Sequence, residues 1–276
     1  MTGLERFMAA KQAEVEALER LARQGGAFDE GGPLCPWKGA RPAFRTALEQ
    51  GKRGASAPLA VIAEFKQASP SRGVICEGLS VEDAARQYAE NGANALSILT
   101  ETQYFHGDMD YLRKAALEVP AMPLLRKDFL FHPLQVAATL ATPASALLLI
   151  VRLTPDAGLL RALREQAEAE GVEAVVEVFD EADLRLARES GARIIQVNAR
   201  DLATLRVDRQ ATLRLIRNCP PLDGELWIAA SGMAERADLD AAADAGYRAA
   251  LVGSALMEGG TPGKALRRLL DGGEPC

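Results

Sequence analysis

The sequence has 276 residues, which is long for one average domain but a common size for a single α/β barrel. Hydrophobic residues make up 48% of the chain and charged residues 25%, which excludes the disordered and fibrous classes. A formal net charge of −6 and a pI near 5.2 argue against nucleic acid and anionic membranes as main partners, because both favour a basic surface.

Residues 1–58 are predicted to be an N-terminal helical extension packed on the rest of the chain. A stretch with helical periodicity, MTGLERFMAAKQAEVEALERLAR, precedes a passage rich in Gly and Pro at residues 25–44. The segment is too short and loop-rich to bury a core of its own. It lacks the apolar centre of a signal peptide, and the chain has no run of 18 apolar residues, so we expect a cytoplasmic protein.

Residues 59–276 are predicted to form one TIM barrel. Eight short apolar runs alternate with amphipathic segments, which is typical of repeated βα units and a parallel sheet. An open doubly wound sheet shares this local pattern, but no GxGxxG follows the first run, which disfavours its dinucleotide-binding form. The runs are residues 59–66, 94–101, 122–129, 145–152, 173–180, 193–200, 225–232 and 249–256.

Polar residues gather at the C-terminal ends of these predicted strands, which is the end where TIM barrels carry their active sites. They are Glu64, Lys66, Lys127, Glu177, Asn198 and Arg200. Any one of them alone is equally well explained as the point where a strand becomes polar, but together they form a charge network suited to acid–base chemistry. Glu64 and Lys66 lie two residues apart and so face the same side. Glu64 can then keep Lys66 protonated, and Lys66 can hold a substrate anion.

A phosphate site is predicted after the seventh and eighth strands, where TIM barrels often bind phosphate. The matching residues are Ser231, Gly232, Gly253 and Ser254. Glycine allows the backbone to approach a ligand closely, and the serine hydroxyls add hydrogen-bond donors.

No metal site or cofactor is predicted. The four cysteines, Cys35, Cys76, Cys219 and Cys276, show no CxxC spacing and are expected to be reduced thiols. His106 and His132 are too few for a zinc cluster and are interpreted as structural or loop residues. Trp37 and Trp227 are interpreted as packing residues.

Six motifs resemble those of the indole-3-glycerol phosphate synthase family. They are IAEFKQASPSRG, LLRKDF, VVEVFDEADL, QVNARDL, ASGM and ALVGSALM. The N-terminal helical stretch also resembles the extra helix of this family, so the resemblance covers nearly the whole chain.

The resemblance implies a carboxy-lyase of tryptophan biosynthesis that closes the indole ring of 1-(2-carboxyphenylamino)-1-deoxyribulose 5-phosphate. Lys127 would be the general acid and Glu177 the base of the dehydration. Lys66 would hold the anthranilate carboxylate and act as an acid in a later step. Positioning and substrate-binding roles would fall to Glu64, Asn198, Arg200 and Ser69, and the phosphate would bind Ser231, Gly232, Gly253 and Ser254. Other tryptophan-pathway enzymes would be the candidate protein partners.

The chain also departs from the family pattern. The family usually has Glu-Ser-Gly at the end of the seventh strand, where this chain has Ala230 before Ser231 and Gly232. His132 and Leu134 stand where an acid and an aromatic residue are common, and Asp108 stands where a small residue is common. An alanine at residue 230 can neither orient a lysine nor take a proton.

Three alternatives remain beside an ordinary synthase. The chain could be a synthase specialised for a secondary indole pathway, or a catalytically weakened paralogue that binds a ligand or acts as a scaffold, which Ala230 favours. A phosphosugar isomerase on the same fold is disfavoured, because it would need a cysteine and aspartate pair. Lys66, Lys127 and Glu177 favour the enzyme, since a scaffold has little reason to keep buried charges.

Overall fold

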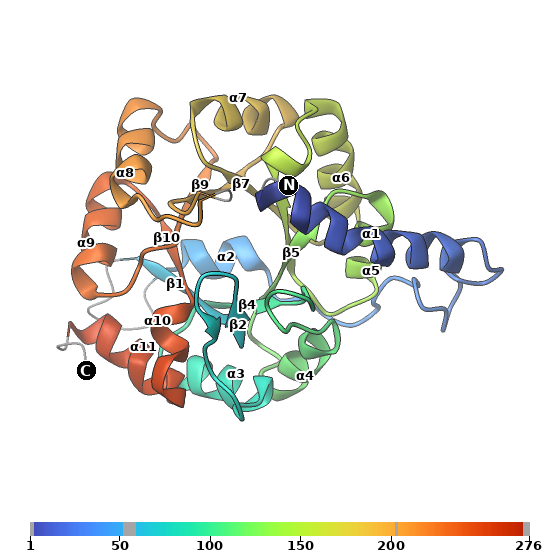
Figure 1. The fold of residues 1–276 in the computed structure, drawn as a ribbon, viewed down its shortest axis with the longest axis horizontal. Helices are drawn as coiled ribbons and strands as arrows, with labels where there is room; N and C mark the ends of the chain where they lie inside the picture. The colour runs from blue at the N-terminus through green and yellow to red at the C-terminus, as the bar shows by residue number, and fades with distance from the viewer. Residues whose placement is uncertain (1–2, 52–58, 202–203, 273–276) are drawn as a thin grey trace.

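The computed structural model describes residues 3–51, 59–201 and 204–272. Within them, eight parallel strands close into a barrel in which neighbours follow the chain order and the last strand pairs with the first. The predicted TIM barrel is therefore confirmed (Figure 1). The strands are β1 (Ala60–Phe65), β4 (Ala95–Leu99), β5 (Leu124–Leu130), β6 (Ala146–Ile150), β7 (Glu173–Val178), β8 (Ile194–Asn198), β9 (Leu226–Ala230) and β10 (Ala249–Val252).

Helices surround the barrel and connect successive strands (Figure 1). They are α3 (Val81–Glu90), α4 (Asp110–Glu118), α5 (Pro133–Leu140), α6 (Ala157–Ala169), α7 (Glu181–Ser190), α8 (Arg209–Asn218), α9 (Arg236–Ala245), the short α10 (Ser254–Met257) and α11 (Pro262–Asp271), with single 3₁₀ turns at Val151–Leu153 and Glu258–Gly260. Several begin at side-chain caps, for example Ser80 before α3 and Asp180 before α7. Helices α7 and α9 end at Gly191 and Gly246, which adopt the left-handed conformation.

The strands are buried on both faces, which explains why their sequences read as continuous apolar runs. Outward residues form one core with the surrounding helices, and inward residues form a second core inside the barrel. Helix α2 (Phe44–Glu49) contributes Phe44 and Leu48 to the inner core, and it contacts β1 and β4. It lies behind the barrel in the view of Figure 1.

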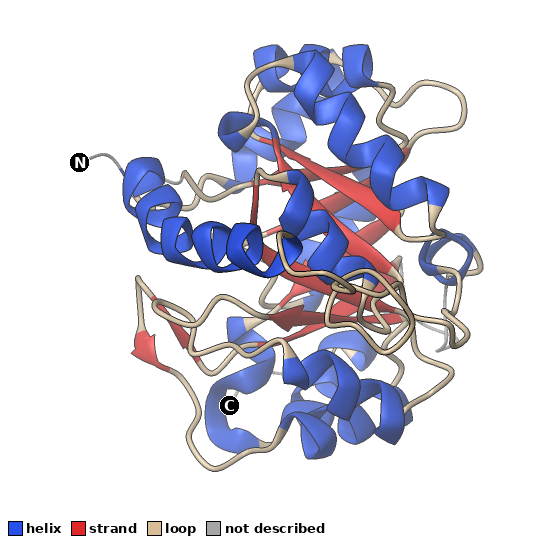
Figure 2. Cartoon of the chain, turned by 90° about the vertical axis from the view of Figure 1, so that its right-hand side faces the viewer, coloured by secondary structure: helices blue, strands red, loops and turns tan. Residues whose placement is uncertain are grey.

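Helix α1 (Gly3–Ala22) packs on α5, β5 and the 3₁₀ turn after β6. It lies in front of the barrel in Figure 1 and at the same end of the barrel as the small hairpin in Figure 2. The hairpin consists of β2 (Ala68–Ser69) and β3 (Gly73–Val74). The predicted N-terminal helix is thus present, whereas the predicted division of the chain at residue 58 falls on residues 52–58, outside the described residues.

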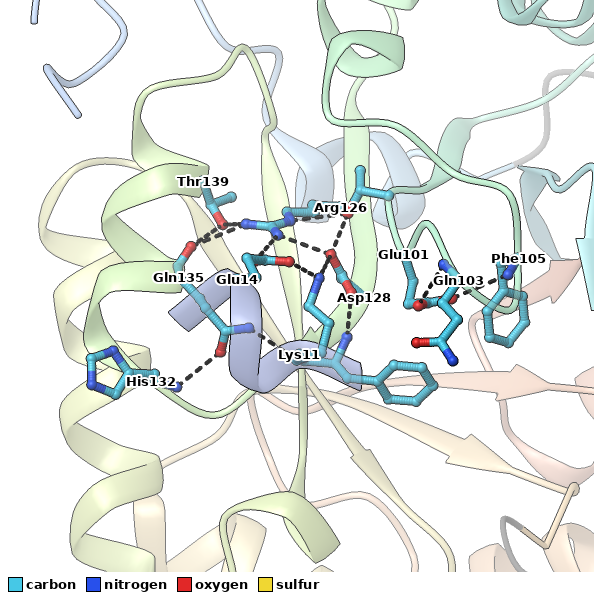
Figure 3. Close-up of polar contacts among 12 residues, drawn as sticks. Lys11, Glu14, Glu101, Gln103, Phe105, Arg126, Asp128, His132, Gln135 and Thr139 are labelled. Atoms are coloured by element: carbon cyan, nitrogen blue, oxygen red, sulfur yellow. Dashed lines mark hydrogen bonds and ion pairs between the residues drawn. The ribbon is translucent and has the colours of Figure 1, made fainter. Parts of the chain in front are cut away.

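A buried ionic network joins α1 to β5 (Figure 3). The Asp128 carboxylate accepts from Lys11 Nζ at 3.0 Å, from Arg126 Nη2 at 2.9 Å and from Thr100 Oγ1 at 2.6 Å. The Arg126 guanidinium also donates to Thr139 Oγ1 at 2.8 Å. Burial alone would raise the pKa of Asp128, but the charges of Arg126 and Lys11 and these hydrogen bonds lower it to about 2.

The predicted strand boundaries need correction at several ends. The eighth run was expected to remain a strand to residue 256, but β10 ends at Val252 and Ser254 begins α10. The sixth and seventh strands end at Asn198 and Ala230, two residues before the predicted ends. The eighth run is apolar again at Ala255 and Leu256, so hydrophobicity alone does not locate its turn, whereas β8 and β9 end where polar residues or glycine follow.

Candidate active site

The C-terminal mouth of the barrel holds a cavity that brings most of the predicted residues together. Its lining includes Glu64, Lys66, Ser69, Lys127, Glu177, Asn198, Arg200, Ser231 and Ser254. An adjoining cavity of about 230 Å³ is lined by the two remaining predicted residues, Gly232 and Gly253. The convergence follows from topology, since residues at the carboxyl ends of parallel barrel strands share one mouth.

Glu64 and Lys66 form a close ion pair at the end of β1. Lys66 Nζ lies 2.7 Å from Glu64 Oε1, and Ser97 Oγ donates to Glu64 Oε2 at 3.1 Å. Burial alone would raise the pKa of Glu64, but the positive charges of Lys66 and Lys127, with the hydrogen bonds from Lys66 and Ser97, lower it. Glu64 is therefore a fixed anion that can hold Lys66 as a cation.

Lys127 and Glu177 form a second, looser pair across the mouth. Lys127 Nζ lies 3.9 Å from Glu177 Oε2, and the Glu177 side chain is 1% exposed whereas that of Lys127 is 19% exposed. Glu177 also accepts a hydrogen bond from Nε2 of Gln196, on the adjacent strand β8. An ammonium and a carboxylate that face each other in this way can donate and accept protons at one place.

The adjoining cavity is walled by glycines and cations. Besides Gly232 and Gly253, it is lined by Arg72, Arg200 and Arg209. Ser231 and Gly232 both have left-handed backbone, with φ of 65° and 78°, and so turn the chain away directly after β9. Such a backbone at a non-glycine residue is uncommon and concentrates at functional sites.

Gly253 allows the backbone after β10 to approach the Glu64–Lys66 pair. A Cβ atom at residue 253 would lie 2.5 Å from Glu64 Oε1 and 3.0 Å from Lys66 Nζ. Only glycine therefore fits at the end of β10 without displacing the ion pair. This contact links the two cavities across the junction of the first and last barrel strands.

Asn198, Arg200 and Ser69 also lie at the mouth. Asn198 Oδ1 accepts from the Arg200 backbone N–H at 2.9 Å, and Arg200 Nη1 donates to Leu205 O at 2.9 Å. Burial lowers the pKa of Arg200, and the nearby charge of Arg72 adds to this effect. The buried Ser69 Oγ has no hydrogen-bond partner among the described residues, so it has a donor to offer a ligand.

The aromatic wall of the cavity was not predicted. Phe7 of α1 stacks on Phe129 of β5 with ring centroids 4.2 Å apart, and Phe105 lies 6.1 Å from Phe129. All three rings line the cavity. Strand alternation could have identified Phe129, two residues after Lys127, but no local signal places Phe7 of the N-terminal helix at the barrel mouth.

The loop that carries Phe105 is held by a buried carboxylate. Glu101 accepts hydrogen bonds from the backbone N–H groups of Gln103 at 2.9 Å and Phe105 at 3.1 Å (Figure 3). It also accepts from the backbone N–H of Tyr104 at 2.7 Å. Three other residues that line the two cavities were not predicted, namely Arg72, Arg209 and Gln196. Gln196 precedes Asn198 by two residues, so the same alternation could have located it.

The residues interpreted as structural lie outside the cavity lining. His132 caps α5 through Nδ1, which accepts from the Leu134 N–H at 3.2 Å. Trp227 is fully buried in the outer core. Cys35, Cys76 and Cys219 are free thiols, whereas Cys276 lies outside the described residues. Within residues 3–51, 59–201 and 204–272, no group of three His, Cys, Asp or Glu side chains is arranged to hold a metal ion.

Comparison with known proteins identifies the family. The sequence model of the indole-3-glycerol phosphate synthase family matches residues 4–269. The chain belongs to this family. The predicted resemblance is confirmed, and with it the enzyme class of the family, a carboxy-lyase of tryptophan biosynthesis.

Individual relatives agree over most of their length. The indole-3-glycerol phosphate synthase of Koribacter versatilis (strain Ellin345) is 41% identical over 82% of this chain and 85% of its own. The synthase of Desulfotalea psychrophila (strain LSv54 / DSM 12343) is 38% identical over 96% of this chain and 97% of its own. The N-terminal extension and the barrel thus both lie within the matched region.

Solved structures support the fold. A crystal structure of 3-hexulose-6-phosphate synthase matches with a TM-score of 0.62 at 14% identity, and the match covers 78% of this chain and all of that chain. At this identity the similarity shows the barrel fold alone. In the part of the chain that the structure describes, no helix is both long and apolar enough to cross a membrane.

Proposed function

We propose that the chain closes the indole ring of 1-(2-carboxyphenylamino)-1-deoxyribulose 5-phosphate, with loss of carbon dioxide and water, to give indole-3-glycerol phosphate. One observation carries the proposal. Two lysines, each beside a buried glutamate, face one cavity that has an aromatic wall and opens into a second cavity walled by glycines and arginines.

The two cavities suit the two ends of this substrate. The stacked pair Phe7 and Phe129, with Phe105, offers an apolar wall for the phenyl ring. Lys66, fixed by Glu64, would hold the carboxylate of that ring. The phosphate would lie in the adjoining cavity and be bound by Ser231, Gly232, Gly253 and Ser254, with Arg200 in support.

The acid–base roles follow from the lysine–glutamate pairs. Ring closure needs an acid to protonate the ribulose carbonyl oxygen, and Lys127 is the lysine whose ammonium is held only loosely, 3.9 Å from Glu177. Glu177 would then take the proton released in the dehydration, while Lys66 would act as an acid in the later step. Asn198 and Ser69 would orient the substrate hydroxyls. The cationic side chains would stabilise the developing negative charge, so the scheme needs neither a metal nor an organic cofactor.

The second candidate is a weakened relative that binds the ligand without turnover, or a synthase with a specialised indole substrate. Ala230 favours it, since a methyl group stands at the end of β9 where the family usually has a glutamate. Against it, the buried charges of Glu64 and Glu177 are retained with their partners, and such charges are costly to keep without use.

The test is a fluorescence assay of indole formation from the synthetic carboxyphenylamino-deoxyribulose phosphate, run on the unmodified protein beside Ala230→Glu. We expect turnover by the unmodified protein, which would show that a carboxylate at residue 230 is dispensable. Turnover only in Ala230→Glu would establish the weakened relative. Silence in both would reject the substrate.

The setting of the reaction follows from the same proposal. We place the enzyme in the cytoplasm, with a phosphorylated small molecule as its substrate and other tryptophan-pathway enzymes as candidate partners. Fractionation of cells that express the tagged chain would test the first point, and co-purification with those enzymes would test the last.

A further inference from the structure

Gln196 lies deep in the mouth, directly beside Glu177. The two residues are register partners on β7 and β8, and Gln196 is fully buried. Its Nε2 donates to Glu177 Oε2, and its Oε1 has no hydrogen-bond partner among the described residues. The amide nitrogen therefore holds the carboxylate, while the buried amide oxygen is an acceptor that is not used in this state.

An unpaired buried amide oxygen is costly, because it has lost its hydrogen bonds to water without gaining a protein partner. A methionine would fill the same volume without that cost, so the amide calls for a chemical reason. Glutamine differs from most side chains because one flat group carries both a donor and an acceptor. A carboxylate needs donors around it, whereas a carboxylic acid needs an acceptor for its O–H. An amide can serve both forms.

We propose that Gln196 is a positioning residue that holds Glu177 in both of its protonation states. Before proton transfer, Nε2 donates to the carboxylate. When Glu177 takes a proton from the substrate, the amide turns about its last side-chain bond and Oε1 accepts the new O–H. Gln196 gains and loses only hydrogen bonds, and Glu177 returns its proton to water after the product leaves. The inference rests on the proposed role of Glu177 as a base.

The surroundings permit this rotation. The terminal torsion of glutamine is broad and roughly two-fold, and a half-turn exchanges nitrogen and oxygen within nearly the same outline. Ala230, which lines the same cavity on the adjacent strand β9, places only a methyl group there. Gln196 lines the same cavity, and its own register partner on β9 is Ile228, whereas Ala230 is the partner of Asn198.

The first test is kinetic. Gln196→Met keeps the volume and removes both hydrogen-bonding functions, and we expect kcat to fall about 10- to 100-fold with KM changed less than about 3-fold. Gln196→Glu can donate to Glu177 only while the two carboxylates share one proton. We expect it to keep part of the activity at lower pH and to lose that activity as the pH rises, because the shared proton is then lost.

A matched control removes a buried hydrogen bond elsewhere. Ser190 is fully buried in α7 and donates to Ala187 O at 2.6 Å, so Ser190→Ala is expected to lower stability without changing kcat. If Gln196→Met behaved in the same way, with stability lowered and kcat unchanged, Gln196 would be a packing residue only and the proposal would fail.

The second test needs no turnover, so it separates this inference from the proposed reaction. The side-chain ¹⁵N amide signal of Gln196 is assigned by its loss in Gln196→Met. We expect this signal to shift with pH in the unmodified protein and to stop shifting in Glu177→Gln. A signal that does not respond to pH, or that still responds in Glu177→Gln, would overturn the pairing even in a protein with full activity.

Discussion

Lys11 Nζ lies 3.0 Å from Asp128 Oδ2, a buried contact between the N-terminal helix and the strand that carries Lys127. On the outer face of β5, Asp128 binds α1 and Arg126 binds α5. The alternate residues Lys127 and Phe129 face the mouth of the barrel. One strand thus fixes the helix on one side and presents Lys127, the proposed general acid, on the other.

The Lys11–Asp128 contact is expected to be a large contributor to stability. Lys11→Met leaves the Asp128 carboxylate buried with less positive charge around it, and removing one partner of such a pair costs about 3–5 kcal/mol. Urea unfolding at neutral pH measures the loss. Lys114→Met, which removes an exposed partner of Asp110, is the control and should cost much less, because water screens an exposed ion pair. Equal losses in the two variants would contradict the prediction.

Stability should fall in acid because of Asp128. The pKa of this carboxyl is lowered from its ordinary 3.8 to about 2, so folding favours its ionised form. The stabilisation is complete above about pH 4, amounts to roughly 2 kcal/mol, and disappears as the pH falls to about 2. Urea midpoints measured across this range should show the fall. Asp128→Asn should be less stable at neutral pH and show a flatter dependence, with a remainder from Glu64, whose pKa is also lowered.

Lys127→Ala is expected to abolish turnover and leave the fold intact, because its ammonium has no ion pair closer than the 3.9 Å contact with Glu177 among the described residues. Loss of a general acid costs about 100- to 10,000-fold. The measurement is kcat by indole fluorescence, with far-ultraviolet circular dichroism to check folding. Lys114→Ala serves as the control. Near-normal activity in Lys127→Ala would remove it from the role of acid.

Gly253→Ala should weaken phosphate binding more than it weakens the fold. The new methyl group would meet the Glu64–Lys66 pair at 2.5 and 3.0 Å and displace it. We expect the inhibition constant of inorganic phosphate and the KM of the substrate to rise about 10-fold or more. A loss of about 1.4 kcal/mol of binding free energy weakens the affinity tenfold. Gly25→Ala meets no atom within 4 Å and should change neither value. Unchanged phosphate inhibition in Gly253→Ala would place the phosphate elsewhere.

Much of the barrel could be predicted because its signals are local. Each strand is an apolar run, and alternation within a strand assigns Glu64 and Lys66 to one face. The same rule places Lys127 and Glu177 at one mouth once eight βα units are counted. The family resemblance then assigned their roles, which remain predictions until they are measured.

The missed features depend on long-range packing. Nothing in the helical pattern around Phe7 says that this side chain stacks on Phe129, far along the chain. Alternation could have assigned Gln196 to the mouth, but only the β7–β8 register places its amide against Glu177. The end of β10 was misplaced because apolar residues resume after Gly253 and Ser254, so hydrophobicity does not show that the strand has ended and a helix begins.

The adjoining cavity spans the place where the barrel closes. Lys66 follows β1 and Gly253 follows β10, so the first and last strands both contribute to it, and these strands are paired. A ligand that occupies the cavity therefore contacts residues that follow both the first and the last strand, and so stabilises the closed barrel. At a concentration 100 times its dissociation constant, such a ligand stabilises the folded chain by about 2.7 kcal/mol. A chain that ends before β10 lacks the part of the cavity that follows this strand, so the ligand does not stabilise its folded state in this way.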